Sequence, residues 1–266
     1  MPDEWIRILF LGDVFGKPGR DVLSENLAAY REEHAIDFCI ANGENAAGGN
    51  GITPKIAEVL FKSGIDVITT GDHVWDRKEV EEYLSSCENI LRPLNFPDDS
   101  PGKGMVVWES SGYQKICVIN LIGRVFMRPS DSPFTAVERA LREIGDSCPV
   151  TVVDFHAEAT SEKVAMGRFL DGKVSAVLGT HTHIQTADET VLPGGTAYIT
   201  DVGMTGPFDS VIGLNVKEVV ANYRYHIKRK FSPARDDVRM GGVILEVDPK
   251  SGRTGSIRRV EEKFVG

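Results

Sequence analysis

Short apolar runs that each end in a few polar residues are the feature that most constrains how this chain can fold. Five runs have the length of a strand and are rich in β-branched residues, and amphipathic stretches of helical length separate several of them. These runs comprise residues 6–11, 38–41, 67–70, 150–155 and 174–178. Strands that alternate with helices predict an α/β fold in which helices cover the sheets.

The same periodicity, with start and stop signals, predicts the remaining elements. Helices are expected at residues 20–33, 53–64, 133–144 and 161–169. Further strands are expected at residues 105–108, 115–120 and 196–200, and an antiparallel hairpin at 241–247 and 255–261. Because the later strands follow one another closely, the pattern allows two stacked sheets. No linker interrupts the pattern, so one domain is expected over residues 1–266.

The composition limits the possible partners. The net charge of −9 repels nucleic-acid backbones, so binding to duplex nucleic acid is not expected, whereas metal ions could attract a small nucleotide. No apolar run approaches the ~20 residues of a membrane span, and the start of the chain does not have the pattern of a signal peptide. The four cysteines form no C-x-x-C pair, which favours reduced thiols and the cytoplasm. A homo-oligomer remains open.

Polar residues gather where the apolar runs end. Ligands of open α/β sheets bind beyond the carboxyl ends of the strands, so these side chains converge on one crevice if their strands are neighbours in a sheet. Four of the six histidines of the chain lie at such ends. The candidate site residues are Asp13, Glu44, Asn45, Asp72, His73, His156, His181 and His183.

This set of side chains suits a metal centre. Carboxylates, an amide oxygen and imidazoles together favour ions such as iron, manganese or zinc, and the lack of a cysteine argues against structural zinc. The candidates outnumber the ligands of one tetrahedral ion. Two ions ~3.5–4 Å apart, bridged by a carboxylate and a hydroxide, would use them all.

Simpler roles exist for single members of the set. Asp13 could cap the next helix, Asn45 could belong to a turn, and His156 could be a hydrogen-bonded core histidine. The pair His181 and His183 is more specific, because residues i and i+2 share one face of an extended chain and can reach one site. The joint position at strand ends favours metal binding for all of them.

These motifs resemble the calcineurin-like metallophosphoesterases and, within them, the YmdB-like branch of 2′,3′-cyclic-nucleotide phosphodiesterases. The resemblance spans nearly the whole chain. It is carried by the Phe-Leu-Gly-Asp-Val-Phe-Gly, Ala-Asn-Gly-Glu-Asn-Ala, Gly-Thr-His-Thr-His and Thr-Asp-Val-Gly-Met-Thr-Gly-Pro stretches at residues 10–16, 41–46, 179–183 and 200–207. It implies an α/β fold of two stacked mixed β-sheets flanked by helices, in four layers, αββα.

The resemblance also implies roles for the site residues and a pair of transition-metal ions. Iron is expected, manganese or a mixed pair is possible, and zinc is less favoured. Glu44 would bridge both ions and His73 would be the general acid. Asp13, Asn45 and His183 would hold the first ion, and Asp72, His156 and His181 the second.

Two positions depart from the pattern of the superfamily. Val14 and Phe15 follow Asp13 where Asp-x-His is commoner, so Asn45 would complete the shell. Asp72 stands where an asparagine is usual before the histidine, which puts metal preference and rate in doubt. Asp76 could orient His73 or be only a surface acid at a turn.

The sequence therefore predicts an enzyme that hydrolyses small phosphodiesters, with 2′,3′-cyclic nucleotides as the expected substrates. A metal-bound hydroxide would attack phosphorus while His73 protonates the leaving oxygen. Two alternatives remain open: a phosphomonoesterase of the same superfamily, and a regulatory binding protein whose metal site is structural.

Overall fold

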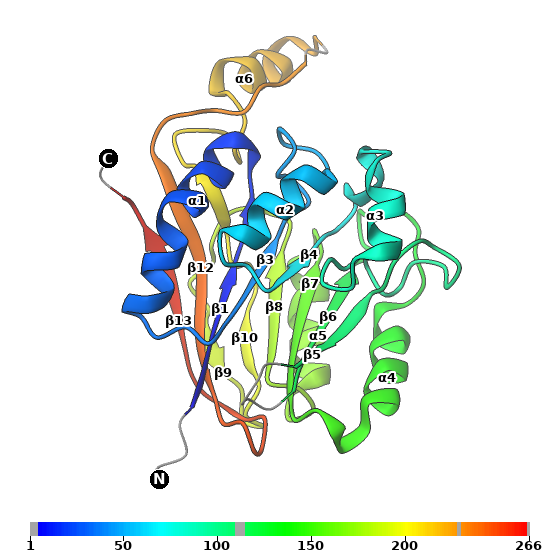
Figure 1. Cartoon of the computed structure of the whole chain (residues 1–266). Helices are drawn as coiled ribbons and strands as arrows, with labels where there is room; N and C mark the ends of the chain where they lie inside the picture. The colour runs from blue at the N-terminus through cyan, green and yellow to red at the C-terminus, as the bar shows by residue number, and fades with distance from the viewer. Residues whose placement is uncertain (1–4, 110–114, 228–229, 265–266) are drawn as a thin grey trace.

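Two mixed β-sheets lie face to face in the middle of the molecule, and helices cover the outer face of each (Figure 1). This computed structural model describes residues 5–109, 115–227 and 230–264. The expected arrangement of two stacked mixed sheets flanked by helices is confirmed.

The first sheet has seven strands. Its central strand β1 runs parallel to β3, which runs parallel to β4, and antiparallel to β12 on its other side. The strands in order are β2 (Asp13–Val14), β11 (Met204–Pro207), β12 (Val238–Val247), β1 (Ile6–Leu11), β3 (Phe38–Asn42) and β4 (Val67–Thr69), with β13 (Thr254–Glu262) paired to β12.

The second sheet has six strands, of which the four central ones are parallel. Their order is β5 (Met105–Trp108), β6 (Ile116–Ile122), β7 (Val150–His156), β8 (Ala176–Thr180), β10 (Ala197–Ile199) and β9 (Thr190–Val191). Antiparallel strands β5 and β9 form its two edges.

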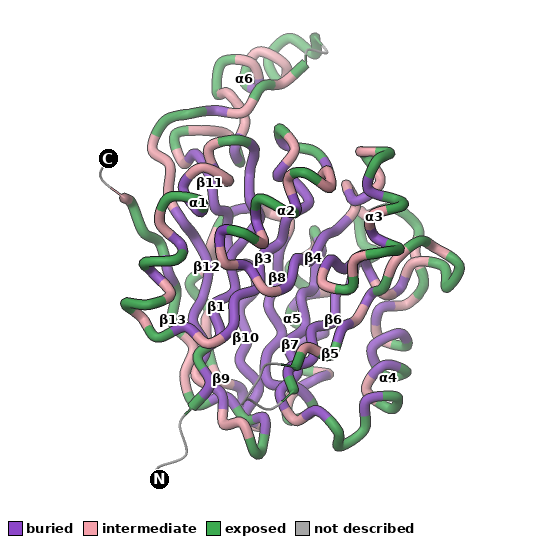
Figure 2. Tube along the Cα trace, viewed as in Figure 1, coloured by how far each residue is buried: buried purple, intermediate pink, exposed green. Residues whose placement is uncertain are grey.

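Alternation along each strand builds the layers, because successive side chains point to opposite faces of a sheet. In β1, Ile8 and Phe10 pack into the core between the two sheets. Leu9 and Leu11 face the other way, into the core beneath the helices. Both faces of the central strands are therefore buried, as Figure 2 shows along their length.

The helices divide between the two outer faces. Helices α1 (Gly16–Glu33), α2 (Pro54–Lys62) and α3 (Val80–Ser86) cover the first sheet. Helices α4 (Pro133–Ile144) and α5 (Thr160–Leu170) cover the second. Two short 3-10 turns lie at Val74–Asp76 (η1) and Gly145–Ser147 (η2). Helix α6 (Val216–Tyr225) stands away from the body of the molecule (Figure 1). No helix of the described residues is long and apolar enough to span a bilayer.

The expected start of the first helix at residue 20 is wrong, since α1 begins at Gly16. Gly16 has a φ of +60°, and its amide donates to the carbonyl of Asn45 at 3.0 Å. A Cβ at Gly19 would lie 2.4 Å from the carbonyl oxygen of Thr205. Gly19 is therefore needed for close packing of the helix on β11, and the positive φ of Gly16 is one that favours glycine.

Other boundaries shift by a few residues. Strand β8 runs from Ala176 to Thr180, two residues later than expected, and β12 begins at Val238, three residues earlier. Strands β2, β9 and β11 and helix α3 are not predicted, because elements of two to seven residues carry little periodicity. Helices α2 and α4 begin at the prolines that the sequence indicates, after Thr53 and Ser132 as N-caps.

Candidate metal centre

The carboxyl ends of parallel strands from both sheets meet at one end of the molecule (Figure 1). The five strands are not neighbours in one sheet: β1, β3 and β4 belong to the first sheet, and β7 and β8 to the second. Asp13 lies in the short strand β2, just beyond β1, and His156 is the last residue of β7. The candidate residues therefore meet where the two sheets come together.

Glu44, Asp72, His156 and His181 form one group, which we call the second subsite. One ligand atom from each of the four residues lies within 4.8 Å of the others. The Nε2 atom of His156 is 3.0 Å from Oε1 of Glu44 and 3.3 Å from Oδ1 of Asp72. It is also 3.0 Å from Nδ1 of His181. Two carboxylates and two imidazoles thus face one small space, as ligands of a divalent ion do.

Asp13, Asn45 and His183 form an adjoining group, the first subsite. The Nε2 atom of His183 is 3.3 Å from Oδ1 of Asn45 and 3.7 Å from Oδ1 of Asp13. The other oxygen of Asp13 accepts a hydrogen bond of 3.2 Å from the amide of His181, which belongs to the second subsite. The two subsites are therefore joined through this bond and through the sequence neighbours Glu44 and Asn45.

Two carboxylate oxygens of these groups lack hydrogen-bond partners among the described residues. Both Oδ1 of Asp13 and Oε1 of Glu44 are buried and accept no hydrogen bond. Glu44 Oε1 lies close to His156, but only as an ion-pair contact. Leaving a buried charged oxygen unpaired is costly, and bound cations remove that cost. The residues present therefore fit a metal centre.

Gly71 explains how the backbone comes so close to these side chains. A Cβ at this position would lie 2.2 Å from Cδ2 of His156 and 2.4 Å from Oε2 of Glu44. Any side chain would displace one of them. The glycine before Asp72 is thus required by the packing of the site.

Comparison with known proteins agrees with this geometry. The family model described as YmdB-like protein matches residues 9–260. The chain belongs to the YmdB-like family. It is 44% identical to the 2′,3′-cyclic-nucleotide 2′-phosphodiesterase of Bacillus subtilis over 255 residues, which cover 96% of each chain.

Solved structures of similar proteins have the same fold as this YmdB-like chain. A hypothetical protein from Thermus thermophilus superposes with a TM-score of 0.90 at 41% identity, covering 97% of this chain and 99% of the other. A novel phosphatase from Mycoplasma pneumoniae gives a TM-score of 0.91 at 34% identity, with 98% and 94% covered.

A buried network orients His156 in this YmdB-like centre. Its Nδ1 atom lies 2.9 Å from Oγ1 of Thr180, and that hydroxyl donates to Oδ1 of Asp154 at 2.7 Å. Asn42 donates to the other oxygen of Asp154 at 3.1 Å. Because the Thr180 hydroxyl is used as a donor, it accepts from Nδ1–H, which leaves Nε2 as the atom that faces the second subsite.

The His181–His183 segment differs from the extended chain expected for it. His181 has a φ of +97° and His183 a φ of +65°, both in the left-handed region. Their side chains accordingly reach different subsites instead of sharing one. The extended backbone expected at these two residues is wrong, because the strand has already ended at Thr180.

A buried ion pair stabilises this unusual backbone. Asp201 accepts hydrogen bonds from the amide of Thr182 at 3.1 Å and from its hydroxyl at 2.6 Å. The same oxygen lies 2.7 Å from Nζ of Lys163, and the other accepts from the amide of Gly203 at 2.8 Å. Asp201 and Lys163 are both almost fully buried. Supporting residues of this kind set the orientation of metal ligands.

Glu158 is a further neighbour that the sequence does not indicate. Its Oε2 lies 3.1 Å from Nε2 of His181, on the side of the ring opposite to the second subsite. A carboxylate in this place fixes the orientation of a ligand imidazole. Its position two residues after His156 would have been the signal, but charged residues after a strand are common.

His73 lies at the edge of the centre and is partly exposed. Its amide donates to Oε2 of Glu44 at 3.2 Å, and its Nδ1 lies 2.9 Å from Oδ2 of Asp76. The contact with Asp76 favours an orienting role over that of an isolated surface acid. Nε2 of His73 lies 4.0 Å from Oδ2 of Asp72, which is too far for a hydrogen bond, so this atom can still donate to another partner.

The charges of the centre shift the pKa values of its histidines in opposite directions. Burial alone would lower the pKa of His156, but the carboxylates of Glu44 and Asp72 raise it well above its ordinary value. Burial, together with the charge of His156, lowers the pKa of His181 to about 4. Burial would raise the pKa of Asp72, yet its hydrogen bond to His156 and the charge of that ring keep it well below its ordinary value. In the absence of metal, a proton on His156 therefore supplies positive charge beside the carboxylates of Glu44 and Asp72, where a metal ion would otherwise do so.

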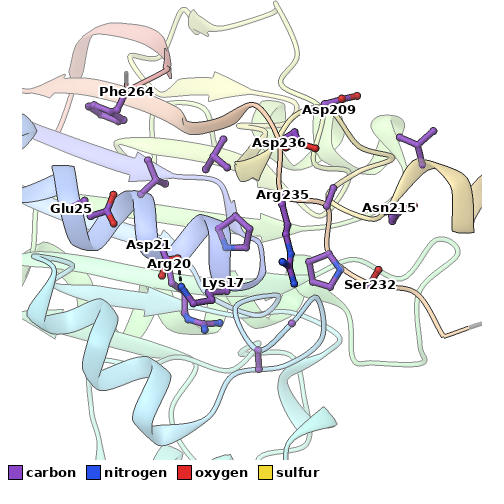
Figure 3. A pocket seen from close by; sticks show the side chains of 18 of the residues that line it. Lys17, Arg20, Asp21, Glu25, Asp209, Asn215, Ser232, Arg235, Asp236 and Phe264 are labelled. Carbon is purple, nitrogen blue, oxygen red and sulfur yellow. Dashed lines mark hydrogen bonds and ion pairs between the residues drawn. The ribbon is translucent and has the colours of Figure 1, made fainter. Parts of the chain in front are cut away.

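A separate pocket has a volume of about 1500 Å³ and lies beside the start of α1 (Figure 3). Lys17, Arg20 and Arg235 line it together with Asp21 and Asp236, so charges of both signs are present. None of the residues of the two subsites is among those that line it. The pocket is therefore distinct from the metal centre.

Metal uptake is expected to release about one proton per chain near neutral pH, because metal ligands must be deprotonated. Without metal, the raised pKa of His156 keeps a proton on its ring, and that proton must leave when Nε2 binds an ion. Calorimetric titration of the metal-free protein with Mn²⁺, in two buffers of different ionisation enthalpy, measures the release.

The release should fall at pH values above the raised pKa of His156, where the ring is already neutral. The His156→Asn variant should lose most of the proton release that accompanies metal uptake. Identical heats in both buffers would contradict this account.

Proposed function

We propose that this protein is a metal-dependent phosphodiesterase that hydrolyses small phosphodiesters, 2′,3′-cyclic nucleotides above all. The observation that carries the proposal is the pair of buried carboxylate oxygens, on Asp13 and Glu44, that accept no hydrogen bond from the described residues. They lie inside a group of seven side chains suited to metal ions. The 44% identity to a 2′,3′-cyclic-nucleotide 2′-phosphodiesterase supports the substrate class.

The proposed ligands divide between two transition-metal ions. Asp13, Asn45 and His183 would hold the first, and Asp72, His156 and His181 the second, with Glu44 between them. Imidazoles beside carboxylates favour iron or manganese, or a mixed pair, over magnesium. The absence of a cysteine ligand makes zinc less suitable.

Bound metal ions would lower the pKa of a coordinated water and neutralise the charge of the phosphate. His73 would supply the proton that the leaving oxygen needs. Asp76 holds Nδ1 of that ring, so Nε2 can donate toward the ligand. Glu44 also binds the amide of His73, and the general acid therefore keeps a fixed distance from the centre.

The proposal includes a cytoplasmic location and a small phosphodiester as the partner. Cys39, Cys87, Cys117 and Cys148 are free thiols, which suits a reducing compartment. The excess of acidic residues in the chain disfavours binding of long nucleic acids, because the protein would repel their phosphates.

Protein loaded with manganese or iron should hydrolyse adenosine 2′,3′-cyclic phosphate faster than adenosine 2′-phosphate or 3′-phosphate. Release of the monoester and of inorganic phosphate would be followed in parallel. Faster release of inorganic phosphate would favour a phosphomonoesterase, and no turnover of either kind would favour a regulatory binding protein.

His73→Ala should keep the metal content and lower kcat by roughly 10²–10⁴-fold, the usual contribution of general acid catalysis. The loss should shrink for aryl diesters with good leaving groups, because these need no proton. Rates for a series of leaving groups and metal analysis of both proteins test this.

His226, an exposed histidine at the end of α6, provides the matched control. His226→Ala should leave kcat unchanged. If His73→Ala lowers the rates of good and poor leaving groups equally, His73 is a ligand or a structural residue instead.

Asp72→Asn should keep both metals and have diesterase activity equal to or higher than that of the natural sequence. The amide retains an oxygen at the place of Oδ1, 3.3 Å from Nε2 of His156, but removes a negative charge that repels the phosphodiester. Preference for hard ions such as Mn²⁺ should decrease, since these favour charged oxygen. Metal content and kcat/KM with one reloaded metal are the measurements. A large loss of activity with metals intact would show that the enzyme needs the carboxylate.

A further inference from the structure

The loop at residues 123–131, which follows β6, is held firmly at both ends. Asn95 is almost fully buried and ties the ends together. Its Nδ2 donates to the carbonyls of Ile122 and Asp131, each at 2.9 Å, and its Oδ1 accepts from the amide of Ile122 at 2.9 Å. The positions of the loop ends are therefore fixed by one buried side chain.

The same loop is attached directly to the metal centre. Strand β6 pairs with β7 so that Ile122 lies opposite His156, and the amide of Gly123 donates to the carbonyl of His156 at 2.9 Å. Glu162 of α5 then accepts from the amides of Arg124 at 3.0 Å and Val125 at 3.2 Å. The first residues of the loop thus keep a fixed place beside a proposed metal ligand.

Phe126, near the tip of this loop, is unfavourable for folding in two respects. Its side chain is 88% exposed, the largest exposed fraction among the large apolar residues described. Its φ is +62°, in a turn where the amide of Met127 binds the carbonyl of Arg124 at 3.4 Å, a place that suits glycine or asparagine. Neither the exposure nor the backbone conformation is explained by packing, and such positions are typical of functional sites.

We propose that Phe126 is a platform on which the base of a nucleotide substrate stacks, an inference that rests on the proposed function. Phe126 follows Gly123 by three residues, so its Cα lies within about 10 Å of the Cα of Gly123. Aromatic rings bind bases with little sequence preference because every base has a π-face. Arg124 and Arg128 are exposed on either side of Phe126 in the chain and add positive charge to this loop of an otherwise acidic protein.

The test compares a substrate that has a base with one that lacks it. Phe126→Gly and Phe126→Leu should lower kcat/KM for adenosine 2′,3′-cyclic phosphate by about fivefold to a hundredfold, mainly through KM, as loss of one stacked base does. Ribose 2,3-cyclic phosphate, which has no base, should be hydrolysed by these variants as fast as by the natural protein. Phe126→Trp keeps an aromatic ring and should have the same kcat/KM for adenosine 2′,3′-cyclic phosphate as the natural protein.

Folding gives a second readout. Phe126→Gly should unfold at the same or a higher denaturant concentration than the natural protein, because glycine suits the backbone conformation and removes exposed apolar surface. Tyr223→Leu, a change to an exposed aromatic residue on α6, is the matched control and should change the rate for neither substrate.

Equal losses on both substrates, or no loss on either, would overturn the platform. If the natural protein cleaves neither diester, the proposed function fails, and equilibrium dialysis of adenosine 2′-phosphate then decides about Phe126. Tighter binding to the natural protein than to Phe126→Gly supports the platform, and equal binding overturns it.

Discussion

The fold brings three carboxylates, those of Asp13, Glu44 and Asp72, to one place where the two sheets meet. The low dielectric of the interior strengthens the repulsion among these carboxylates. Positive charge must therefore lie among them if they are to stay ionised in the folded protein. In the protein alone, a proton on His156 is the compensating charge. The need for positive charge at this place is thus built into the positions of the strand ends and does not depend on a particular substrate.

Much of this arrangement can be predicted from the sequence, because it depends on local patterns. Strand β1 and helix α4 have the predicted bounds, since alternation and capping signals are properties of neighbouring residues. The glycine before Asp72, Gly71, also marks where the backbone approaches the site. The ligand roles and the single-domain organisation stay predictions, which the metal and kinetic experiments address.

What the sequence does not reveal are contacts between residues far apart in the chain. The pair of Lys163 and Asp201 joins a helix to a strand end 38 residues away, and a lysine within a helix usually faces solvent. Asp201 of that pair also accepts a hydrogen bond from the amide of Thr182 and so supports the left-handed backbone of the neighbouring His181. The backbone conformation of Phe126 is also not revealed by the sequence, because its neighbours in the chain do not predict a turn that suits glycine.

Because the residues of the centre come from both sheets, bound metal would affect the stability of the fold and the abundance of the protein in the cell. Glu44 follows β3 of the first sheet, and His156 ends β7 of the second. An ion held by both residues would therefore link the two sheets. Because such an ion binds only the folded chain, its binding free energy adds to the stability of the fold in proportion to the logarithm of the free metal concentration. Metal scarcity would then reduce the abundance of the protein as well as its activity, since proteases remove chains that open more often.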